Sequence, residues 1–306
     1  MMASDAYTSA GDKGEQGSGR AATSREPMIS IRGLNKRFGS QRVLCGIDLD
    51  VLASEIMVVM GGSGCGKSTL LRHMTGLMEP DEGSIRLLGQ DITQLSDEAL
   101  KELRKRYGIL FQSGALFNSL SVGENVALPL REHTNLDART IEIMVKIKLE
   151  LVGLREHTDK MPAQLSGGMK KRAGLARAIA LDPQILFYDE PSAGLDPVTS
   201  AQIDRLIIDL TRKLDVTSVV VTHEMDSAFT IADRMCMLDK GVVLKVGPRR
   251  EFESLRDASV ESLKSERELL IRQFLRGASE GPITDRQQSS GYAEDLLLED
   301  MQGQER

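Results

Sequence analysis

The chain has 306 residues, of which 41% are hydrophobic and 27% are charged, and its formal net charge is −6. This composition is ordinary for a soluble globular protein, and the acidic balance argues against nucleic acid as a partner, because duplex binders normally present a basic surface. The three cysteines are far apart in sequence and form no CxxC pair, which indicates neither a disulfide framework nor a zinc site and favours the cytoplasm.

Residues 1–27 are rich in glycine, serine and charged side chains and contain no apolar stretch. We expect a disordered leader here, not a signal peptide. The longest apolar runs further along, such as residues 56–60, have the length of a strand and fall far short of the roughly 20 residues that cross a bilayer. Any membrane role is therefore expected to go through a partner.

Strand patterns open the folded part of the chain. Residues 28–34 and 42–52 alternate apolar and polar positions. The buried strand predicted at residues 55–60 leads into a glycine-rich loop and a helix that stops near Pro80. A further short strand and turn follow at residues 84–92. This order is typical of a nucleotide-binding α/β domain.

Helical patterns then replace the strands, so a helical insert is predicted at about residues 97–175. Strands return from residue 185 onwards, and the folded domain is expected to span residues 28–265. The tail, residues 266–306, has one short amphipathic helix around residues 269–275 and an acidic end that we expect to be disordered.

The sequence GGSGCGKS at residues 61–68 matches the pattern G-x-x-x-x-G-K-[ST] between a buried strand and a helix. Its glycines let backbone N–H groups wrap a β-phosphate, Lys67 reaches the β- and γ-phosphate oxygens, and Ser68 supplies a hydroxyl to Mg²⁺. We therefore predict a nucleotide site that uses Mg²⁺. Cys65 is either a small residue that fits the loop or a thiol whose pKa is lowered by the helix start, and we favour the first interpretation.

An acidic motif, ILFYDEP at residues 185–191, ends an apolar strand in two carboxylates. Phosphoryl transfer needs one acid in the Mg²⁺ shell and another group that orients the attacking water. We assign Asp189 to the metal and Glu190 to the water. Together with the glycine-rich loop, this pair predicts an enzyme that hydrolyses a nucleotide.

The segment LSGGMKKR at residues 165–172 carries no nucleophile, metal-ligand cluster or acid/base pair. A serine that can cap a helix, two glycines that let a ligand approach, and the free N–H groups of a helix start make a second site for an anion. The basic run at residues 170–172 is expected to be a solvated helix face. The chain thus offers two phosphate-binding loops but one acidic pair.

Three single residues have an ordinary and a functional interpretation. Gln112, after a short strand, is either a surface amide or a site contact, and His223, after another strand, is either a capping or core histidine or a γ-phosphate contact. Phe38 is either a core aromatic or a ring that stacks on a purine. Their order around the two strong motifs favours the functional interpretations.

The order of these motifs, with SAGLDP at residues 192–197 after the acidic pair, resembles the ATP-binding cassette (ABC) family of ATPases over residues 28–247. The resemblance implies an α/β P-loop NTPase core with an antiparallel β subdomain and an inserted α-helical subdomain. It also implies ATP and Mg²⁺ as cofactors and a homodimer in which each ATP lies between the phosphate loop of one copy and the signature segment, residues 165–169, of the other. Met169 stands where the family more often has Gln, and the effect of that difference is open.

The resemblance assigns a role to each of the following residues. The catalytic residues would be Lys67, Gln112, Glu190 and His223. Mg²⁺ would be held by Ser68, Gln112 and Asp189. The signature contacts in trans would be Ser166, Gly167 and Gly168, and a dimer-interface residue would be Asp196. The ATP contacts would be Phe38, Gly61, Gly62, Ser63, Gly64, Cys65, Gly66, Lys67, Ser68 and Thr69.

Three stretches resemble more specifically the ATPase subunits of Mla/Mce-type phospholipid transporters: residues 165–183, DEPSAGLDP at residues 189–197, and QFLRG-x-x-EGPI at residues 273–283. This implies a peripheral subunit on the cytoplasmic face of the bacterial inner membrane that powers a permease dimer. A periplasmic Mce-domain lipid-binding protein would be reached through the permease, and phospholipids would move between membranes to maintain outer-membrane lipid asymmetry.

The resemblance implies that the helical insert passes motion from Gln112 to the permease. We consider residues 113–130 either the docking surface for that partner or an ordinary core-lining loop and helix start. The tail helix around residues 269–275 is a candidate for clasping the second copy or another protein, because of its apolar stripe.

Other functions remain open at the level of sequence. The core motifs fit a transporter subunit for amino acids, metals or solvent-type substrates equally well. A soluble cassette ATPase that assembles iron–sulfur clusters is another alternative, and recovery with membrane proteins would argue against it. A chromosome-associated cassette ATPase is disfavoured, because roughly 100 residues separate the two main motifs and leave no room for a long coiled coil.

Overall fold

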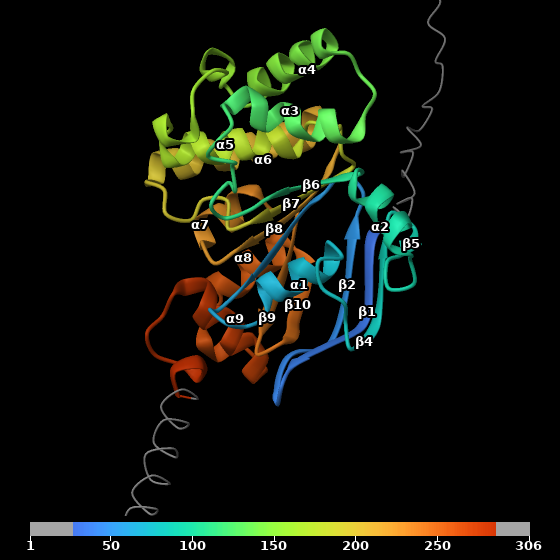
Figure 1. Cartoon of the computed structure of the whole chain (residues 1–306). Helices are drawn as coiled ribbons and strands as arrows, with labels where there is room; N and C mark the ends of the chain where they lie inside the picture. Colours follow the sequence, from blue (N-terminus) through green and yellow to red (C-terminus); the bar gives the residue numbers. More distant parts are fainter. Residues whose placement is uncertain (1–26, 286–306) are drawn as a thin grey trace, which may run out of the picture.

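The structure is a computed structural model that describes residues 27–285. Within them, an antiparallel sheet, a mainly parallel sheet and a helical lobe are arranged side by side (Figure 1). The predicted leader lies outside the described residues except for Pro27, which already belongs to the first strand. The predicted disordered end of the tail lies outside them from residue 286 onwards.

A four-stranded antiparallel sheet forms one side of the molecule (Figure 1). Its members in spatial order are β2 (Gln41–Leu52), β1 (Pro27–Phe38), β4 (Glu82–Leu87) and β5 (Gln90–Asp91). β1 and β2 have alternating buried and exposed positions and a register interrupted by irregularities. One face of this sheet is therefore apolar and packs on the rest of the domain.

A six-stranded sheet forms the centre. Its spatial order is β10 (Val242–Pro248), β9 (Arg234–Asp239), β3 (Ile56–Gly61), β8 (Thr217–Thr222), β7 (Ile185–Asp189) and β6 (Tyr107–Leu110). All neighbouring pairs are parallel except β9 with β10. The connections between the parallel strands carry helices, as this topology requires.

The central strands are buried on both faces. In β3, Ile56, Val58 and Met60 belong to a core shared with the helices, whereas Met57 and Val59 belong to a core shared with the antiparallel sheet. Successive side chains of a strand point to opposite faces, so one continuous apolar run serves both cores.

Most of the helices pack on the face of the six-stranded sheet that lies away from the antiparallel sheet, and some extend beyond its ends (Figure 1). In chain order they are α1 (Lys67–Met74), α2 (Asp97–Arg104), α3 (Val122–His133), α4 (Ala138–Leu151), α5 (Gly167–Ala178), α6 (Pro197–Lys213), α7 (Met225–Ile231), α8 (Arg249–Asp257) and α9 (Glu266–Arg276). Short 3₁₀ turns occupy Arg155–His157, Pro162–Gln164 and Val260–Ser262. The lobe at the top of Figure 1 consists of α3, α4 and α5, which contact one another.

The predicted helical insert differs from the structure at its start. Residues 97–175 include β6, which pairs with β7 inside the six-stranded sheet, so the helical lobe begins after Leu110. The sequence predicts a short strand before Gln112, but no local pattern encodes its pairing with the distant β7. The lobe ends with α5, at Ala178.

The structure has one helix that the sequence did not predict, in the stretch between β10 and the predicted tail. α8 precedes α9, and its Phe252 is fully buried in the core shared with the helices. Most other positions of α8 are polar, so its sequence gives a weak apolar stripe. Both helices lie at the end of the molecule opposite the helical lobe (Figure 1). Across residues 27–285, the helices are too short or too polar to cross a bilayer.

The close approach of α5 to β6 gives a prediction for stability. A Cβ on Gly108 would overlap the backbone carbonyl oxygen of Ala178 at the end of α5. We expect Gly108→Ala to lower the free energy of unfolding by about 1–3 kcal/mol, as overpacking does elsewhere. Urea denaturation measures this. Gly62→Ala is the control, because a Cβ there meets no atom within 4 Å; equal stability of both variants would contradict the packing described.

Candidate functional site

The glycine-rich loop joins the end of β3 to the start of α1. Gly61 has a φ of 153° and a Cβ there would overlap the carbonyl oxygen of Leu238, so a larger residue cannot occupy this position. Gly66 has a φ of 107°, and its Cβ would lie 2.9 Å from the carbonyl oxygen of Val43. The backbone conformation of the loop therefore requires glycine at both positions, because a larger residue would clash with neighbouring carbonyl oxygens.

The start of α1 suits an anion. No side chain caps its first N–H groups, and no acidic residue lies in its first turn. These free donors and the positive end of the helix dipole attract negative charge. Lys67 adds an ammonium that is 8% exposed and donates to the carbonyl oxygens of Gly61 at 2.8 Å and Gly62 at 2.9 Å. The loop therefore gathers positive charge.

A hydroxyl and a carboxylate meet beside this loop. The Ser68 hydroxyl donates to Oδ1 of Asp189, at the end of β7, over 3.4 Å. Burial, followed by the neighbouring Glu190 carboxylate, raises the pKa of Asp189. Two hard oxygen donors at this spacing suit Mg²⁺, and a cation would relieve the repulsion between the two carboxylates.

Glu190 and His223 form a second polar pair at the same edge of the sheet. Nδ1 of His223 lies 2.9 Å from Oε2 of Glu190, and the His223 backbone N–H donates to the same oxygen at 3.3 Å. The Glu190 side chain is 13% exposed and that of His223 is 59% exposed. A carboxylate oriented by a solvent-accessible imidazole is suited to hold a water molecule next to a phosphate.

A cleft of about 410 Å³ connects these groups. It brings together residues from the loop, from the end of β6 and from the ends of β7 and β8, as predicted for Gln112, Glu190 and His223. The residues that line it are Val43, Ser63, Gly64, Gly66, Lys67, Ser68, Thr69, Gln112, Glu190 and His223. The sequence did not predict Val43, because an ordinary apolar strand residue belongs to no motif.

The other predicted site residues lie outside this lining: Phe38, Gly61, Gly62, Cys65, Ser166, Gly167, Gly168, Asp189 and Asp196. Phe38, at the end of β1, is 48% exposed and has the Lys36 ammonium 5.9 Å from its ring centre. Ser166 caps α5 by accepting from the Met169 N–H at 3.3 Å, and Asp196 caps α6 by accepting from two backbone N–H groups. Within one chain, the signature segment and the cleft are thus separate sites.

The signature segment and the start of α6 pack closely together. A Cβ on Gly168 would overlap the Thr199 side chain, and one on Gly167 would lie 3.3 Å from Leu195. The hydrogen bond from Thr199 holds the pKa of Asp196 below its usual range. The glycines therefore let two helix starts approach each other on one surface.

Two sequence interpretations are resolved by burial. Lys171, predicted to lie on a solvated helix face, is 5% exposed, so that prediction was wrong for it. Its ammonium donates to the carbonyl oxygens of Glu190 at 3.0 Å and Ala193 at 2.9 Å. Cys65 is 5% exposed and burial raises the pKa of its thiol, which supports its interpretation as a small residue that fits the loop.

Thiol reactivity tests this packing. Cys65 and Cys236 are buried, burial raises the pKa of Cys236 to about 12, and Cys45 is partly exposed. Because thiolates react and buried thiols do not, we expect Cys45 to react fast with an aromatic disulfide reagent and the other two after unfolding in urea. Cys45→Ser should remove the fast phase; a fast phase that persists in this variant would contradict the burial of Cys65.

Comparisons with known proteins give the family. A family model for ABC transporters matches residues 44–193. The intermembrane phospholipid transport system ATP-binding proteins MlaF of Haemophilus influenzae and Escherichia coli K12 are 40% and 41% identical to the chain, over 88% of it and 98% and 96% of their own lengths. The probable ribonucleotide transport ATP-binding protein mkl of Mycobacterium leprae is 43% identical over 90% of this chain and 77% of its own length.

Solved structures of similar fold also belong to ABC cassettes. The dimeric ATP-binding cassette MJ0796 with bound ADP and Pi has a TM-score of 0.67 at 30% identity, covering 73% of this chain and 99% of that one. CbiO1 of Clostridium perfringens, from an ABC transporter complex, has a TM-score of 0.70 at 29% identity, covering 75% and 92%. The predicted α/β cassette fold is thereby confirmed. The chain belongs to the ABC transporter family, as one of its ATP-binding subunits.

Proposed function

We propose that the chain is the ATP-hydrolysing subunit of a phospholipid transport complex and that two copies close over two ATP molecules. The observation that carries this is the separation within one chain: the cleft gathers Lys67, Glu190 and His223, while the anion-binding start of α5 faces elsewhere. A second copy, placed head to tail, would bring each signature segment to the cleft of the other. The dimeric cassette of similar fold supports this arrangement.

In this proposal each cleft residue has one task. Loop N–H groups hold the phosphates, and Lys67 exchanges its two carbonyl partners for phosphate oxygens. Ser68, Gln112 and Asp189 would hold Mg²⁺, which would neutralise negative charge on the phosphates. Phe38, being exposed, is available to stack on adenine.

Glu190 and His223 would complete the reaction centre. Glu190 accepts a proton from, and orients, the water that attacks the γ-phosphate. His223, already bonded to Glu190, keeps the carboxylate in place and contacts the γ-phosphate. Ser166, Gly167 and Gly168 of the second copy would close the site and Asp196 would lie at the dimer interface, so ATP holds the two copies together.

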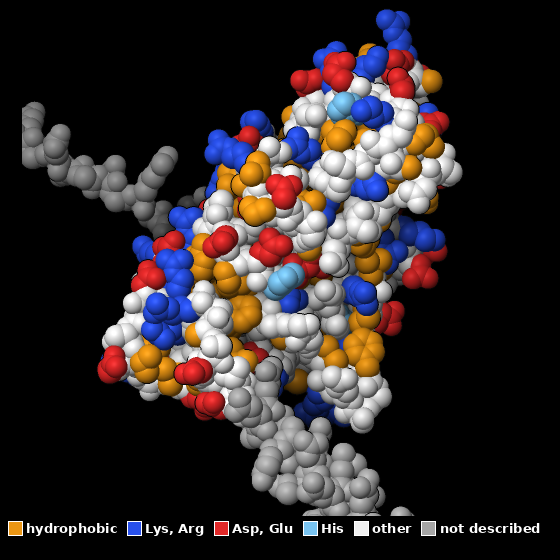
Figure 2. Space-filling model, turned by 90° about the vertical axis from the view of Figure 1, so that its left-hand side faces the viewer, with side chains coloured by type: hydrophobic (Ala, Val, Ile, Leu, Met, Phe, Trp, Pro, Cys, Tyr) orange, Lys and Arg blue, Asp and Glu red, His pale blue; other side chains and the backbone are white. Residues whose placement is uncertain are grey.

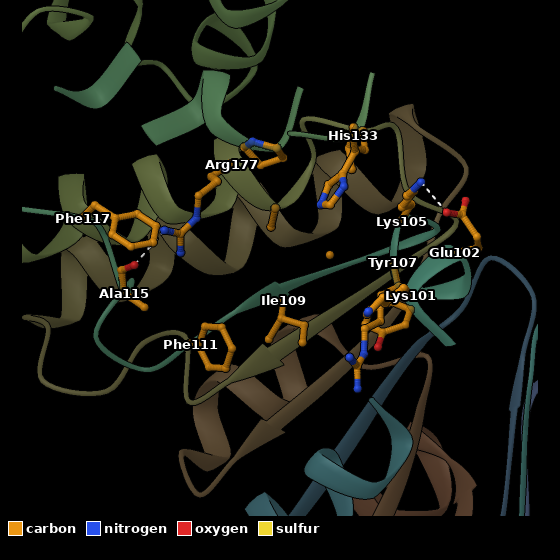
Figure 3. Close-up of a pocket in the computed structure, with 15 residues that line it drawn as sticks. Lys101, Glu102, Lys105, Tyr107, Ile109, Phe111, Ala115, Phe117, His133 and Arg177 are labelled. Atoms are coloured by element: carbon orange, nitrogen blue, oxygen red, sulfur yellow. Dashed lines mark hydrogen bonds and ion pairs between the residues drawn. The ribbon is translucent and has the colours of Figure 1, made fainter. Parts of the chain in front are cut away.

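A second pocket of about 700 Å³ is the surface we propose for the permease. It lies between β6 and the helical lobe, where Figure 3 shows Phe117 and Arg177 facing Phe111 and Ile109. Phe111 and Phe117 are 40% and 52% exposed. Apolar rings open to solvent in a pocket suit a partner helix or loop.

This pocket is joined to the ATP cleft. Arg177, from α5, donates to the carbonyl oxygens of Gly114 at 3.1 Å and Ala115 at 2.7 Å, two and three residues after Gln112. Movement of Gln112 with the γ-phosphate would therefore move the rim of the pocket. The docking segment predicted at residues 113–130 contributes Ala115, Phe117 and Pro129 to its lining.

Phospholipid is the proposed cargo because the match to the phospholipid transport proteins spans 96–98% of their length, against 77–81% for the mycobacterial relatives named for ribonucleotides. The subunit itself need not contact the cargo. A permease dimer in the bacterial inner membrane, with this chain on its cytoplasmic face and an Mce-domain protein on the other side, would select it. On the face in Figure 2, basic and acidic side chains are interspersed, which fits a protein partner better than nucleic acid.

Replacing Glu190 tests the reaction centre. We expect Glu190→Gln to lower steady-state ATP hydrolysis at least about 100-fold, the low end of a general-base contribution, while ATP is still bound and the dimer persists. Phosphate release and size-exclusion chromatography with ATP measure the two effects. Hydrolysis at the wild-type rate would contradict the assignment.

Gentle detergent extraction with this subunit tagged tests cargo and docking together. We expect a permease, an Mce-domain protein and phospholipid to be recovered, and Phe117→Glu to lose the permease without losing ATP binding. Ile147→Glu is the matched control, because Ile147 is similarly exposed, at 53%, but lies on α4 outside the pocket. Recovery of a soluble scaffold, or of bound ribonucleotide without lipid, would overturn the proposed cargo.

A further inference from the structure

The residue that carries the reaction in our proposal has an unusual backbone. Glu190 has a φ of 49°, in the left-handed region that few non-glycine residues adopt. Such a conformation persists where the surroundings over-determine it. Its N–H donates to the Val221 carbonyl oxygen at 2.9 Å, and its carboxylate is held by His223. The remaining polar group, the carbonyl oxygen, accepts from the Ala193 N–H at 3.3 Å and from Lys171.

Lys171 reaches this carbonyl from the helix that begins with the signature segment. It lies on α5, five residues after Ser166, and its Nζ contacts the carbonyl oxygens of Glu190 and Ala193 at 3.0 and 2.9 Å. The ammonium is buried, and burial lowers the pKa of Lys171. Burying an ammonium group is energetically unfavourable unless it is hydrogen-bonded. Here its hydrogen bonds go to two carbonyl oxygens of one turn.

Ser192, in the same turn, is held by separate hydrogen bonds. The Ser192 hydroxyl lies 3.3 Å from that of Ser227 on α7, and Ser227 donates to the buried Asp204 carboxylate on α6 at 2.7 Å. The turn after Glu190 is thus fixed to α6 and α7 independently of α5. Removal of Lys171 should therefore loosen the Glu190 side of the turn without unfolding the domain.

We propose that Lys171 is a positioning residue for ATP hydrolysis, which fixes the Glu190 backbone and ties it to the signature helix; this rests on the proposed role of Glu190. In the head-to-tail dimer, α5 touches the ATP of the other copy. The rigid turn and a half of helix between Ser166 and Lys171 then connects the occupancy of one ATP site to the geometry of Glu190 at the other.

Steady-state kinetics of the full-length chain test this inference. We expect Lys171→Met to lower kcat at least about tenfold with KM for ATP within about twofold, because positioning acts on the transition state and not on ATP binding. Lys171→Arg, which keeps N–H donors, should recover kcat to within about threefold of the wild type. A structural defect alone would not separate kcat from KM in this way.

Lys148→Met is the matched control. Lys148 is also 5% exposed and lies in the same lobe, on α4, but its ammonium pairs with Asp182. We expect this variant to lose thermal stability and to keep the wild-type kcat. Equal kcat losses in Lys171→Met and Lys148→Met, or a wild-type kcat in Lys171→Met, would overturn the inference. If Lys171→Met does not fold, Lys171→Gln, which retains an amide donor, is measured against the same criteria.

Glu190→Gln, measured in parallel, distinguishes a failure of the role of Lys171 from a failure of the proposed function. If Glu190→Gln is inactive and Lys171→Met is unaffected, the positioning role fails and the proposed function stands. If Glu190→Gln hydrolyses ATP at the wild-type rate, the proposed reaction centre fails and the role of Lys171 fails with it.

Discussion

The parallel pairing of β3, β8 and β7 is the constraint on which the rest of the structure depends. In this register Met60 lies opposite Thr222 and Asp189 lies opposite Val221. The residues that follow each strand therefore leave the sheet at one edge, which is where ligands bind in open α/β sheets. Since a slip of one residue would turn every side chain to the other face, the two apolar cores that hold the register also hold the chemistry in place.

In the proposed mechanism, the starts of two helices both bind phosphate. α1 begins without a side-chain cap and has Lys67 buried beside it, whereas α5 begins with the Ser166 cap and glycines that bring it against the start of α6. The first lies beside the acidic residues and the second does not. In our proposal a second copy brings the two groups of donors together, and this would account for the specific shape of a segment without catalytic groups.

The parts of the site that are encoded by short sequence motifs could be predicted. Features that depend on contacts between residues far apart in the sequence could not. The glycine-rich loop, the Asp189–Glu190 pair and the positions of Gln112 and His223 could be placed, because each follows a recognisable strand. The short strand before Gln112 was recognised, but its place inside the six-stranded sheet was not, so the predicted helical insert began too early. α8 was missed because one buried ring gives no clear period. Lys171 looked like part of a solvated basic run, and its burial follows from how α5 packs on the turn after β7, which no local pattern encodes.

The central claim is that each ATP is bound by two chains, and disulfide trapping measures this most directly. With Cys45, Cys65 and Cys236 replaced by Ser and Glu190→Gln present to prevent turnover, chains carrying Ser166→Cys are mixed with chains carrying Ser63→Cys and oxidised mildly. The account predicts a disulfide-linked dimer in the mixture that requires ATP and is absent from either chain alone. Failure to trap a dimer in the presence of ATP, although ATP is bound, would contradict it.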